Sequence, residues 1–257
     1  MTASSFIDNT VFITGANRGI GLGLVRELAK YSEITLIFAA YYEPDGTEEL
    51  DVVCEKHPSI RKVPIDTTDD KSIKSAAELV EETLGGESSA KLNLLINVAA
   101  ILVLDDPGIT PQEPDREIYL RHFNVNTMGA IMTTAAFLPM LRRAAASNQP
   151  ARVINISSTA GSTEKCHPFY NTAEGMVKNF PYGISKAALT HYTKALSIDE
   201  PEIVAVAICP GWVRTKMGGP NATTTVEECA SGLVERIKNL SKEDSGKFMN
   251  ATGDIPY

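Results

Sequence analysis

Tyr182 and Lys186 stand four residues apart in the segment Tyr-Gly-Ile-Ser-Lys. Residues with this spacing lie on the same face of a helix, so the phenol and the ammonium group would be neighbours. A tyrosine with its ordinary pKa of about 10 is a poor proton donor or acceptor at neutral pH. A neighbouring positive charge favours the phenolate and lowers that pKa. The pair is therefore suited to acid–base chemistry in a crevice, although the same spacing is common on solvated helix faces.

Three glycines follow the first apolar run of the chain, in the segment Thr14-Gly15-Ala16-Asn17-Arg18-Gly19-Ile20-Gly21. Gly15 permits a tight turn, Gly19 lets the pyrophosphate of a dinucleotide approach the backbone, and Gly21 lets the next helix pack closely on a sheet. The N-terminus of that helix offers free N–H groups and a partial positive charge to the phosphates. This pattern predicts a dinucleotide-binding turn. The alternative, a glycine turn that binds nothing, is disfavoured by the strand before it and the helix after it.

Short apolar runs alternate along the chain with stretches of helical periodicity. Strands are predicted at residues 10–14, 34–40, 60–65, 92–97, 152–156, 203–208 and 247–250. Helices are predicted at residues 20–30, 46–57, 69–84, 116–146, 181–198 and 224–240. Strands that are apolar on both faces belong in a sheet covered on both sides, and strand–helix alternation makes that sheet parallel. We therefore predict a single α/β domain over residues 1–257 with a Rossmann fold, a doubly wound parallel sheet of about seven strands with helices on both faces.

The residues suited to chemistry fall at one edge of this predicted sheet. Doubly wound folds bind ligands at the carboxyl ends of their strands. The glycine turn, Ser158 after the fifth strand and Pro210 after the sixth strand all occupy such ends. The helix that carries Tyr182 follows the fifth strand, so it should begin on the same side. We therefore expect the Tyr182 phenol and the dinucleotide turn to face one crevice.

Taken together, these segments resemble the short-chain dehydrogenase/reductase family over essentially the whole chain. The glycine turn matches the family pattern T-G-x3-G-x-G. The resemblance implies a catalytic tetrad of Asn126, Ser158, Tyr182 and Lys186, with Ser158 preferred to Ser157 as the second serine of the family's strand-end pair. It also implies cofactor contacts at Gly15, Asn17, Arg18, Gly19, Ile20, Asp66, Thr67, Asn97, Ala99, Tyr182, Lys186, Pro210, Gly211, Val213 and Thr215.

The resemblance implies a hydride exchange between a nicotinamide cofactor and a substrate carbonyl or alcohol. Ser158 would hold the substrate oxygen while Tyr182 gives it a proton. Lys186 would lower the pKa of Tyr182 and hold the nicotinamide ribose, and Asn126 would position a water that supplies protons to Lys186. The segments 210–220 and 253–257 resemble the sniffer/C-factor group of carbonyl reductases, which suggests small or aromatic carbonyl substrates. A cofactor-binding signalling or sensor protein of the same fold, with little turnover, is the alternative.

The link between Ser158 and Tyr182 is longer than in most of the family. Its added residues, 162–179, include His167, Phe169, Tyr170 and Met176. This insert either borders the substrate site or forms a surface loop, and the sequence is consistent with both interpretations.

The choice between NADP and NAD depends on the residues after the second strand. NAD-binding proteins usually place an acid there to bind the ribose hydroxyls. Here Tyr41 occupies the place where the acid is expected, whereas Arg18 in the glycine turn can meet a 2′-phosphate. Glu43 stands close by and leaves NAD(H) possible. We therefore predict NADP(H) as the cofactor.

The composition narrows the classes of partner. With 24 Lys plus Arg against 32 Asp plus Glu, the formal net charge is -8, which argues against nucleic-acid and anionic-membrane partners. The four cysteines form no CxxC pair and the four histidines are scattered, so no metal site is predicted. Single thiols suit a reducing compartment and no stretch approaches the roughly 20 apolar residues of a membrane span, so we expect a cytoplasmic protein. We expect a small-molecule substrate, and a homodimer formed through the helices at 116–146 and 181–198, which make the subunit interface in many relatives.

Overall fold

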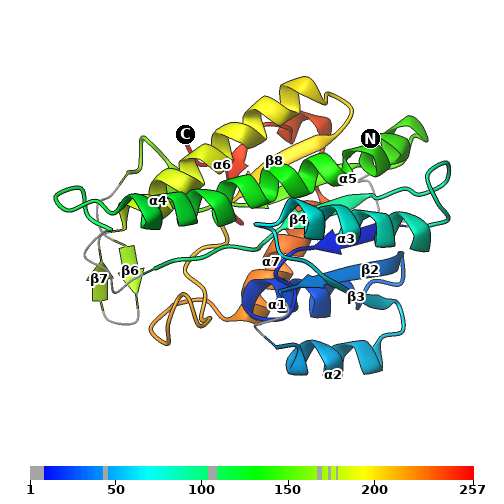
Figure 1. Ribbon diagram of the computed structural model, residues 1–257, viewed down its shortest axis with the longest axis horizontal. Helices are drawn as coiled ribbons and strands as arrows, with labels where there is room; N and C mark the ends of the chain where they lie inside the picture. Colours follow the sequence, from blue (N-terminus) through cyan, green and yellow to red (C-terminus); the bar gives the residue numbers. More distant parts are fainter. Residues whose placement is uncertain (1–8, 43–45, 104–108, 167–169, 173–174, 178) are drawn as a thin grey trace.

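The computed structural model describes residues 9–42, 46–103, 109–166, 170–172, 175–177 and 179–257. These residues build three layers, with a central sheet between two layers of helices (Figure 1). The functional part of the molecule depends on how this sheet is wound.

Seven strands form the central sheet, in the order β3-β2-β1-β4-β5-β8-β9. Their bounds are β1 (Asn9–Ile13), β2 (Ile34–Tyr41), β3 (Ile60–Pro64), β4 (Leu94–Asn97), β5 (Arg152–Ile156), β8 (Val204–Ile208) and β9 (Phe248–Met249). Every pairing in this sheet is parallel. The strand order reverses between β1 and β4, which is where doubly wound sheets bind ligands. The predicted doubly wound parallel sheet of about seven strands is confirmed.

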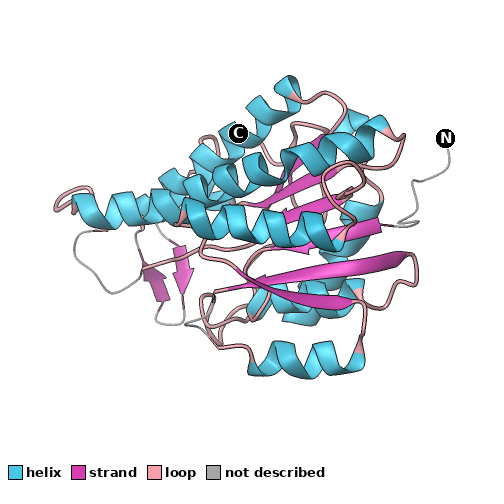
Figure 2. Cartoon of the chain, turned by 45° about the vertical axis from the view of Figure 1, so that its right-hand side comes forward, coloured by secondary structure: helices cyan, strands magenta, loops and turns pink. Residues whose placement is uncertain are grey.

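The two faces of the sheet carry different helices (Figure 2). One face is covered by α1 (Gly19–Leu28), α2 (Glu48–Lys56) and α7 (Val226–Lys238), and the other by α3 (Asp70–Thr83), α5 (Gly129–Ala146) and α6 (Phe180–Asp199). Successive side chains of a strand point to opposite faces, so each strand contributes to both cores. In β1, Val11 and Ile13 join the core under α1 and α7. Phe12 points the other way and packs on Phe137 of α5, with ring centroids 4.2 Å apart.

The helix predicted at residues 116–146 is confirmed in its extent, but it is not α-helical throughout. It is divided into α4 (Arg116–Phe123), a π-helical turn (Asn124–Met128) and α5. A π turn widens the helix by one residue and is frequent at functional sites. Here Asn126 and Thr127 of the wide turn bond to other segments, with Thr127 Oγ1 donating to Ser185 O at 2.8 Å. Helical periodicity cannot reveal this turn because the apolar pattern continues through it.

The insert between Ser158 and Tyr182 holds regular structure that was not predicted. A 3-10 turn (Thr159–Gly161) precedes it, and β6 (Tyr170–Thr172) pairs antiparallel with β7 (Gly175–Val177) in a separate two-stranded sheet. Tyr170 lies in β6 and Met176 in β7, whereas His167 and Phe169 fall outside the described residues. Glu43, which bears on the choice of cofactor, also falls outside them.

Neither a helix able to cross a membrane nor a cluster of metal-binding side chains occurs among the described residues. The four cysteines, Cys54, Cys166, Cys209 and Cys229, are all free thiols.

Candidate active site

A crevice of about 1390 Å³ opens at the carboxyl ends of the strands, where the strand order reverses. It exceeds the roughly 300–1,000 Å³ of an ordinary small-molecule site, so it has room for a dinucleotide and a second molecule. The predicted residues that line it are Gly15, Asn17, Arg18, Gly19, Ile20, Asp66, Thr67, Ala99, Tyr182, Lys186, Pro210 and Thr215. The predicted residues that are not part of its lining are Asn97, Asn126, Ser158, Gly211 and Val213.

The glycine turn forms one wall of the crevice. Gly15 has φ +63°, a left-handed conformation that favours glycine. A Cβ at Gly21 would lie 2.1 Å from Gly15 O, so α1 can approach the turn this closely only without a side chain. The first turn of α1 holds no acid, and no described side chain caps it. Its N–H groups are therefore open to an anion, and the backbone fits the phosphates of a dinucleotide.

Two polar residues flank the glycine turn. Asn17 is buried, and its Nδ2 donates to Gly46 O at 2.9 Å, which ties the turn to the start of α2. Arg18 belongs to the turn itself, and its exposed side chain lines the crevice. The half-exposed Tyr42, just beyond β2, lines the same end of the crevice.

Tyr182 and Lys186 form the opposite wall. Both line the crevice from α6, and Lys186 Nζ lies 5.8 Å from the centre of the Tyr182 ring. Lys186 is only 2% exposed, and its Nζ donates to Ile156 O at 2.7 Å. Burial lowers the pKa of Lys186 to about 8, and the nearby Cys209 thiol raises it slightly. A buried lysine of this kind holds a positive charge beside the phenol at pH 7.

The two serines after β5 have different environments. Ser157 is buried, and its hydroxyl bonds to Lys186 O at 3.2 Å and to Thr190 Oγ1 at 2.7 Å. Ser158 is half-buried, and its Oγ accepts from the Ala160 N–H at 3.2 Å. Among the described residues, nothing accepts the hydroxyl proton of Ser158. That proton is available to a ligand, although Ser158 stands just outside the crevice lining.

Asn126 is not part of the crevice lining, and its side chain bonds to two other segments. Its Oδ1 accepts from the Ile101 N–H at 2.7 Å, and its Nδ2 donates to Ile101 O and to Ser185 Oγ, both at 3.0 Å. Both amide protons are therefore engaged. A water positioned by Asn126 would therefore have to donate a hydrogen bond to Oδ1 or to the main-chain carbonyl oxygen of Asn126.

The residues predicted around the adenine end differ in position. Asp66 lines the crevice, and its Oδ1 accepts from the N–H and the hydroxyl of Thr68, at 2.8 and 2.7 Å. Asn97 instead lies in a buried polar chain, where its Nδ2 donates to Asn155 Oδ1 at 2.8 Å and to Thr134 Oγ1 at 3.1 Å. The side chain of Asn97 is thus bonded inside the sheet, and its proposed cofactor contact stays a prediction.

The loop before α7 closes the crevice beside the glycine turn. Pro210 and Thr215 line it, and Thr215 Oγ1 accepts from the Gly218 N–H at 3.0 Å. A Cβ at Gly19 would lie 3.2 Å from Thr215 Cγ2, so this loop meets the turn directly. Val213 is buried, and neither Val213 nor Gly211 is part of the crevice lining.

A further wall of the crevice, formed by Ile101, Leu102 and Val103, has no signal in the sequence. The side chains that hold it are Asn126, His122 and Asn179. Only Asn179 follows a readable pattern, a helix-capping residue ahead of a proline in the first turn. His122 cannot be linked to the site from sequence because its contact joins two separate segments.

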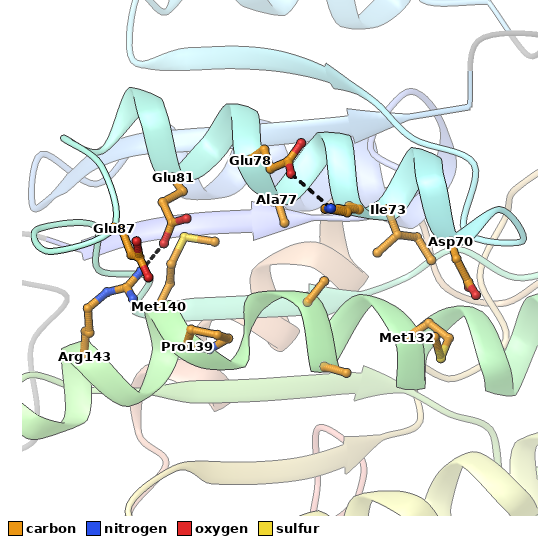
Figure 3. A pocket seen from close by; sticks show the side chains of 13 residues that line it. Asp70, Ile73, Ala77, Glu78, Glu81, Glu87, Met132, Pro139, Met140 and Arg143 are labelled. Atoms are coloured by element: carbon orange, nitrogen blue, oxygen red, sulfur yellow. Dashed lines mark hydrogen bonds and ion pairs between the residues drawn. The ribbon is translucent and has the colours of Figure 1, made fainter.

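A second hollow, of about 440 Å³, lies between α3 and α5 (Figure 3). Ion pairs line its rim, from Arg143 to Glu81 at 2.5 Å and from Lys74 to Glu78 at 3.7 Å. None of the predicted site residues belongs to it. Four of its charged groups form these two ion pairs, and the described lining holds no tyrosine–lysine pair comparable to that of the crevice.

Known proteins resemble this chain over most of its length. A family model described as short chain dehydrogenase matches residues 9–225. The NADPH-bound carbonyl reductase from chicken fatty liver has a TM-score of 0.89 and 37% identity, covering 99% of this chain and 96% of that one. The carbonyl reductase Sniffer of Drosophila melanogaster has a TM-score of 0.84 and 28% identity, covering 98% of this chain and 100% of that one.

A shorter match is the C-signal protein of Myxococcus xanthus, which is 36% identical over 140 residues, 53% of this chain and 77% of that relative. The resemblance to sniffer-type carbonyl reductases is confirmed by these matches. Since the family model spans more than half of the residues and the doubly wound sheet agrees with it, the chain belongs to the short-chain dehydrogenase/reductase family.

Proposed function

We propose that this protein is an NADP(H)-dependent carbonyl reductase that uses Tyr182 as its proton donor. The observation that carries the proposal is the meeting of Tyr182 and the buried Lys186 in the same crevice as the glycine turn. The likeness to a carbonyl reductase solved with NADPH supports both the reaction class and the cofactor. Small or aromatic carbonyl compounds, or the corresponding alcohols, are the proposed substrates.

Lys186 prepares Tyr182 for proton transfer. Its ammonium group, 5.8 Å from the ring centre, favours the phenolate and so makes the phenol a better acid. Because the pKa of Lys186 is about 8, the lysine is mostly protonated at pH 7 and can return a proton to Tyr182. The Ser158 hydroxyl would donate to the substrate oxygen as negative charge develops there. When bound, the nicotinamide supplies the hydride.

The glycine-turn side would hold the cofactor. The backbone at Gly15, Gly19 and Ile20 would meet the pyrophosphate, with Asn17 fixing the turn. Arg18 would bind the 2′-phosphate of NADP, and β2 ends at Tyr41 without an acid for the free ribose hydroxyls of NAD. Asp66, Thr67 and Ala99 would border the adenine and ribose, and Pro210 and Thr215 the carboxamide.

The proposal includes a homodimer in the cytoplasm. Three large apolar side chains are exposed on α4 and α6, Leu120 at 52%, Ile184 at 45% and Ile198 at 70%. A self-complementary contact would remove them from water. Light scattering tests the dimer, and a single monomeric species at micromolar concentration would contradict it.

The direct test of the function is NADPH oxidation against a panel of small and aromatic carbonyl compounds. We expect turnover by the native enzyme and a loss of about 10²–10⁴-fold in kcat for Tyr182→Phe, because the proton donor is gone. Binding of NADPH to the variant should change far less than kcat, because most of the proposed cofactor contacts remain. Near-native turnover by Tyr182→Phe would contradict the assignment.

The C-signal likeness favours a second candidate, a cofactor-binding signalling protein with little turnover. NADPH binding without oxidation against any member of the panel would favour this candidate over the reductase.

A further inference from the structure

The crevice wall formed by Ile101, Leu102 and Val103 is fixed by side chains that come from other elements. Asn126 binds both the N–H and the carbonyl of Ile101. The Val103 N–H donates to His122 Nε2 at 3.3 Å. The Val103 carbonyl accepts a bond from Asn179 Nδ2. The main-chain groups of this wall are thus pinned on either side of Leu102.

Asn179 also fixes the helix that carries the proposed proton donor. It is 0% exposed, and its Oδ1 accepts from the Tyr182 N–H at 2.9 Å. One amide group therefore bonds the backbone of Tyr182 on one side and the backbone of Val103 on the other. The two residues it joins both line the crevice and lie 79 residues apart in the sequence, from 103 to 182.

We propose that Asn179 is a positioning residue, which sets the distance between Tyr182 and the wall at 101–103 and so aligns the phenol with the substrate. This inference rests on the proposed function, because it assigns Tyr182 the proton transfer. Asn179 does not line the crevice and is not expected to touch the substrate. Its effect on turnover passes through Tyr182.

The chemistry of the side chain explains why asparagine suits this place. The bond to Tyr182 needs an acceptor, and the bond to Val103 needs a donor. A primary amide offers both from one rigid plane, whereas a carboxylate offers acceptors only. Aspartate would keep the helix cap and lose the bond to Val103, unless its carboxyl group is protonated. Alanine would lose both bonds at every pH.

Displacing a reactive group by about 1 Å can cost roughly 100-fold in rate, so we expect a measurable loss of turnover. At pH 7, Asn179→Ala and Asn179→Asp should each lower kcat about 10- to 100-fold, while KM for NADPH changes less than about threefold. The activity of Asn179→Asp relative to the native enzyme should recover several-fold toward pH 5, since a protonated carboxyl can donate to Val103 O. The Ala variant should show no such recovery.

A matched control is Asp69→Ala, which removes the cap of α3, where Asp69 Oδ1 accepts from the Lys71 N–H at 3.0 Å. This variant should lower the melting temperature and leave kcat unchanged. Native-like kcat in both Asn179 variants would overturn the inference. So would losses in which kcat, NADPH binding and melting temperature fall together at every pH.

Hydrogen exchange gives a readout that does not depend on activity. In Asn179→Ala, the amide proton of Tyr182 should exchange at least about tenfold faster, because its acceptor is lost. The Val103 amide proton keeps His122 as its acceptor and should exchange faster by a smaller factor, because the carbonyl of the same residue is released. Unchanged exchange at both positions would overturn the inference. If the native enzyme reduces no carbonyl compound, the proposed function fails. The exchange experiment still decides whether Asn179 joins Tyr182 to the wall at 101–103.

Discussion

The two principal walls of the crevice are built in different ways. The glycine-turn wall is one continuous stretch from β1 into α1, and it presents backbone N–H groups. The tyrosine wall is assembled from segments far apart in the sequence, which are joined by side chains such as Asn126, Asn179 and Ser157. A wall made of backbone is suited to bind a ligand common to many proteins. A wall made of side-chain contacts can be adjusted to one reaction.

This difference predicts how substitutions will act. Changes in the glycine turn should alter cofactor binding, and changes around α6 should alter turnover with smaller effects on binding. The following substitutions test whether effects on cofactor binding and effects on turnover are separate.

The largest effect is expected for Lys186→Met on the tyrosine wall. Turnover should fall about 10²–10⁴-fold, because the charge that makes Tyr182 an acid is removed. The cofactor-free protein should nevertheless gain about 1–3 kcal/mol of stability at pH 7, since burying the ammonium is costly and its bond to Ile156 O and contact with the Tyr182 ring offset only part of that cost.

The pH dependence of stability provides the check on Lys186. Its folded-state pKa of about 8 lies below the ordinary value of 10.5, so the folded protein releases this proton first. The native protein should therefore become more stable relative to Lys186→Met as the pH rises from 8 toward 10.5. Chemical denaturation at several pH values measures the difference in unfolding free energy between the two proteins. A Lys186→Met variant less stable than the native protein at pH 7 would contradict the expected cost of burying the ammonium.

A matched pair of glycines compares the two walls directly. A Cβ at Gly21 would lie 2.1 Å from Gly15 O, and a Cβ at Gly161 would lie 2.6 Å from the Lys186 carbonyl carbon. Both alanine variants should lose about 1–3 kcal/mol or more of stability through overpacking. We expect Gly21→Ala to weaken NADPH binding above all, and Gly161→Ala to lower kcat above all.

Gly253→Ala is the control for this pair, because a Cβ there meets nothing within 4 Å. Thermal melts, NADPH titration and kcat on the three variants make the comparison. Equal losses of binding and turnover in both Gly21→Ala and Gly161→Ala would remove the distinction between the walls.

The same distinction explains how much could be predicted from the sequence. The doubly wound sheet and the glycine turn follow from local patterns, namely apolar strands and glycine spacing, and both agree with the structure. The pairing of Tyr182 with Lys186 is also local, within one helix. The π turn at Asn126, the wall at 101–103 and the Asn179 clamp depend on contacts between distant segments, which no spacing in the chain encodes.

A smaller effect is expected for Arg18→Ala on the glycine-turn wall. A charge-assisted bond to the 2′-phosphate is worth about 1.5–3 kcal/mol, so KM for NADPH should rise roughly 10- to 150-fold. KM for NADH and the kcat with either cofactor should change little, because NADH lacks the 2′-phosphate and Arg18 is not part of the helix that carries Tyr182 and Lys186. Steady-state kinetics with NADPH and NADH measures both KM values. An equal rise in the two would show that Arg18 does not bind the 2′-phosphate.

The smallest effect concerns His122, which holds Val103 on the tyrosine wall. The Val103 N–H donates to His122 Nε2, so that nitrogen carries no proton. The proton is on Nδ1, which donates to Ile118 O at 2.8 Å. Burial lowers the pKa of His122 below its usual 6.5, and neighbouring Arg121 adds to this. The unfolded chain therefore takes up the proton first, and the folded state loses stability as the pH falls below 6.5.

His122→Gln tests this dependence, because glutamine can offer an acceptor to Val103 and does not titrate. Between pH 7 and pH 5, the native protein should lose stability relative to the variant. NADPH affinity should not follow this loss, since His122 is not itself part of the crevice lining and bonds to it through Val103. A native protein and variant with parallel pH–stability curves would mean that His122 is not the titrating group that holds Val103, and the wall would then depend on Asn126 and Asn179 alone.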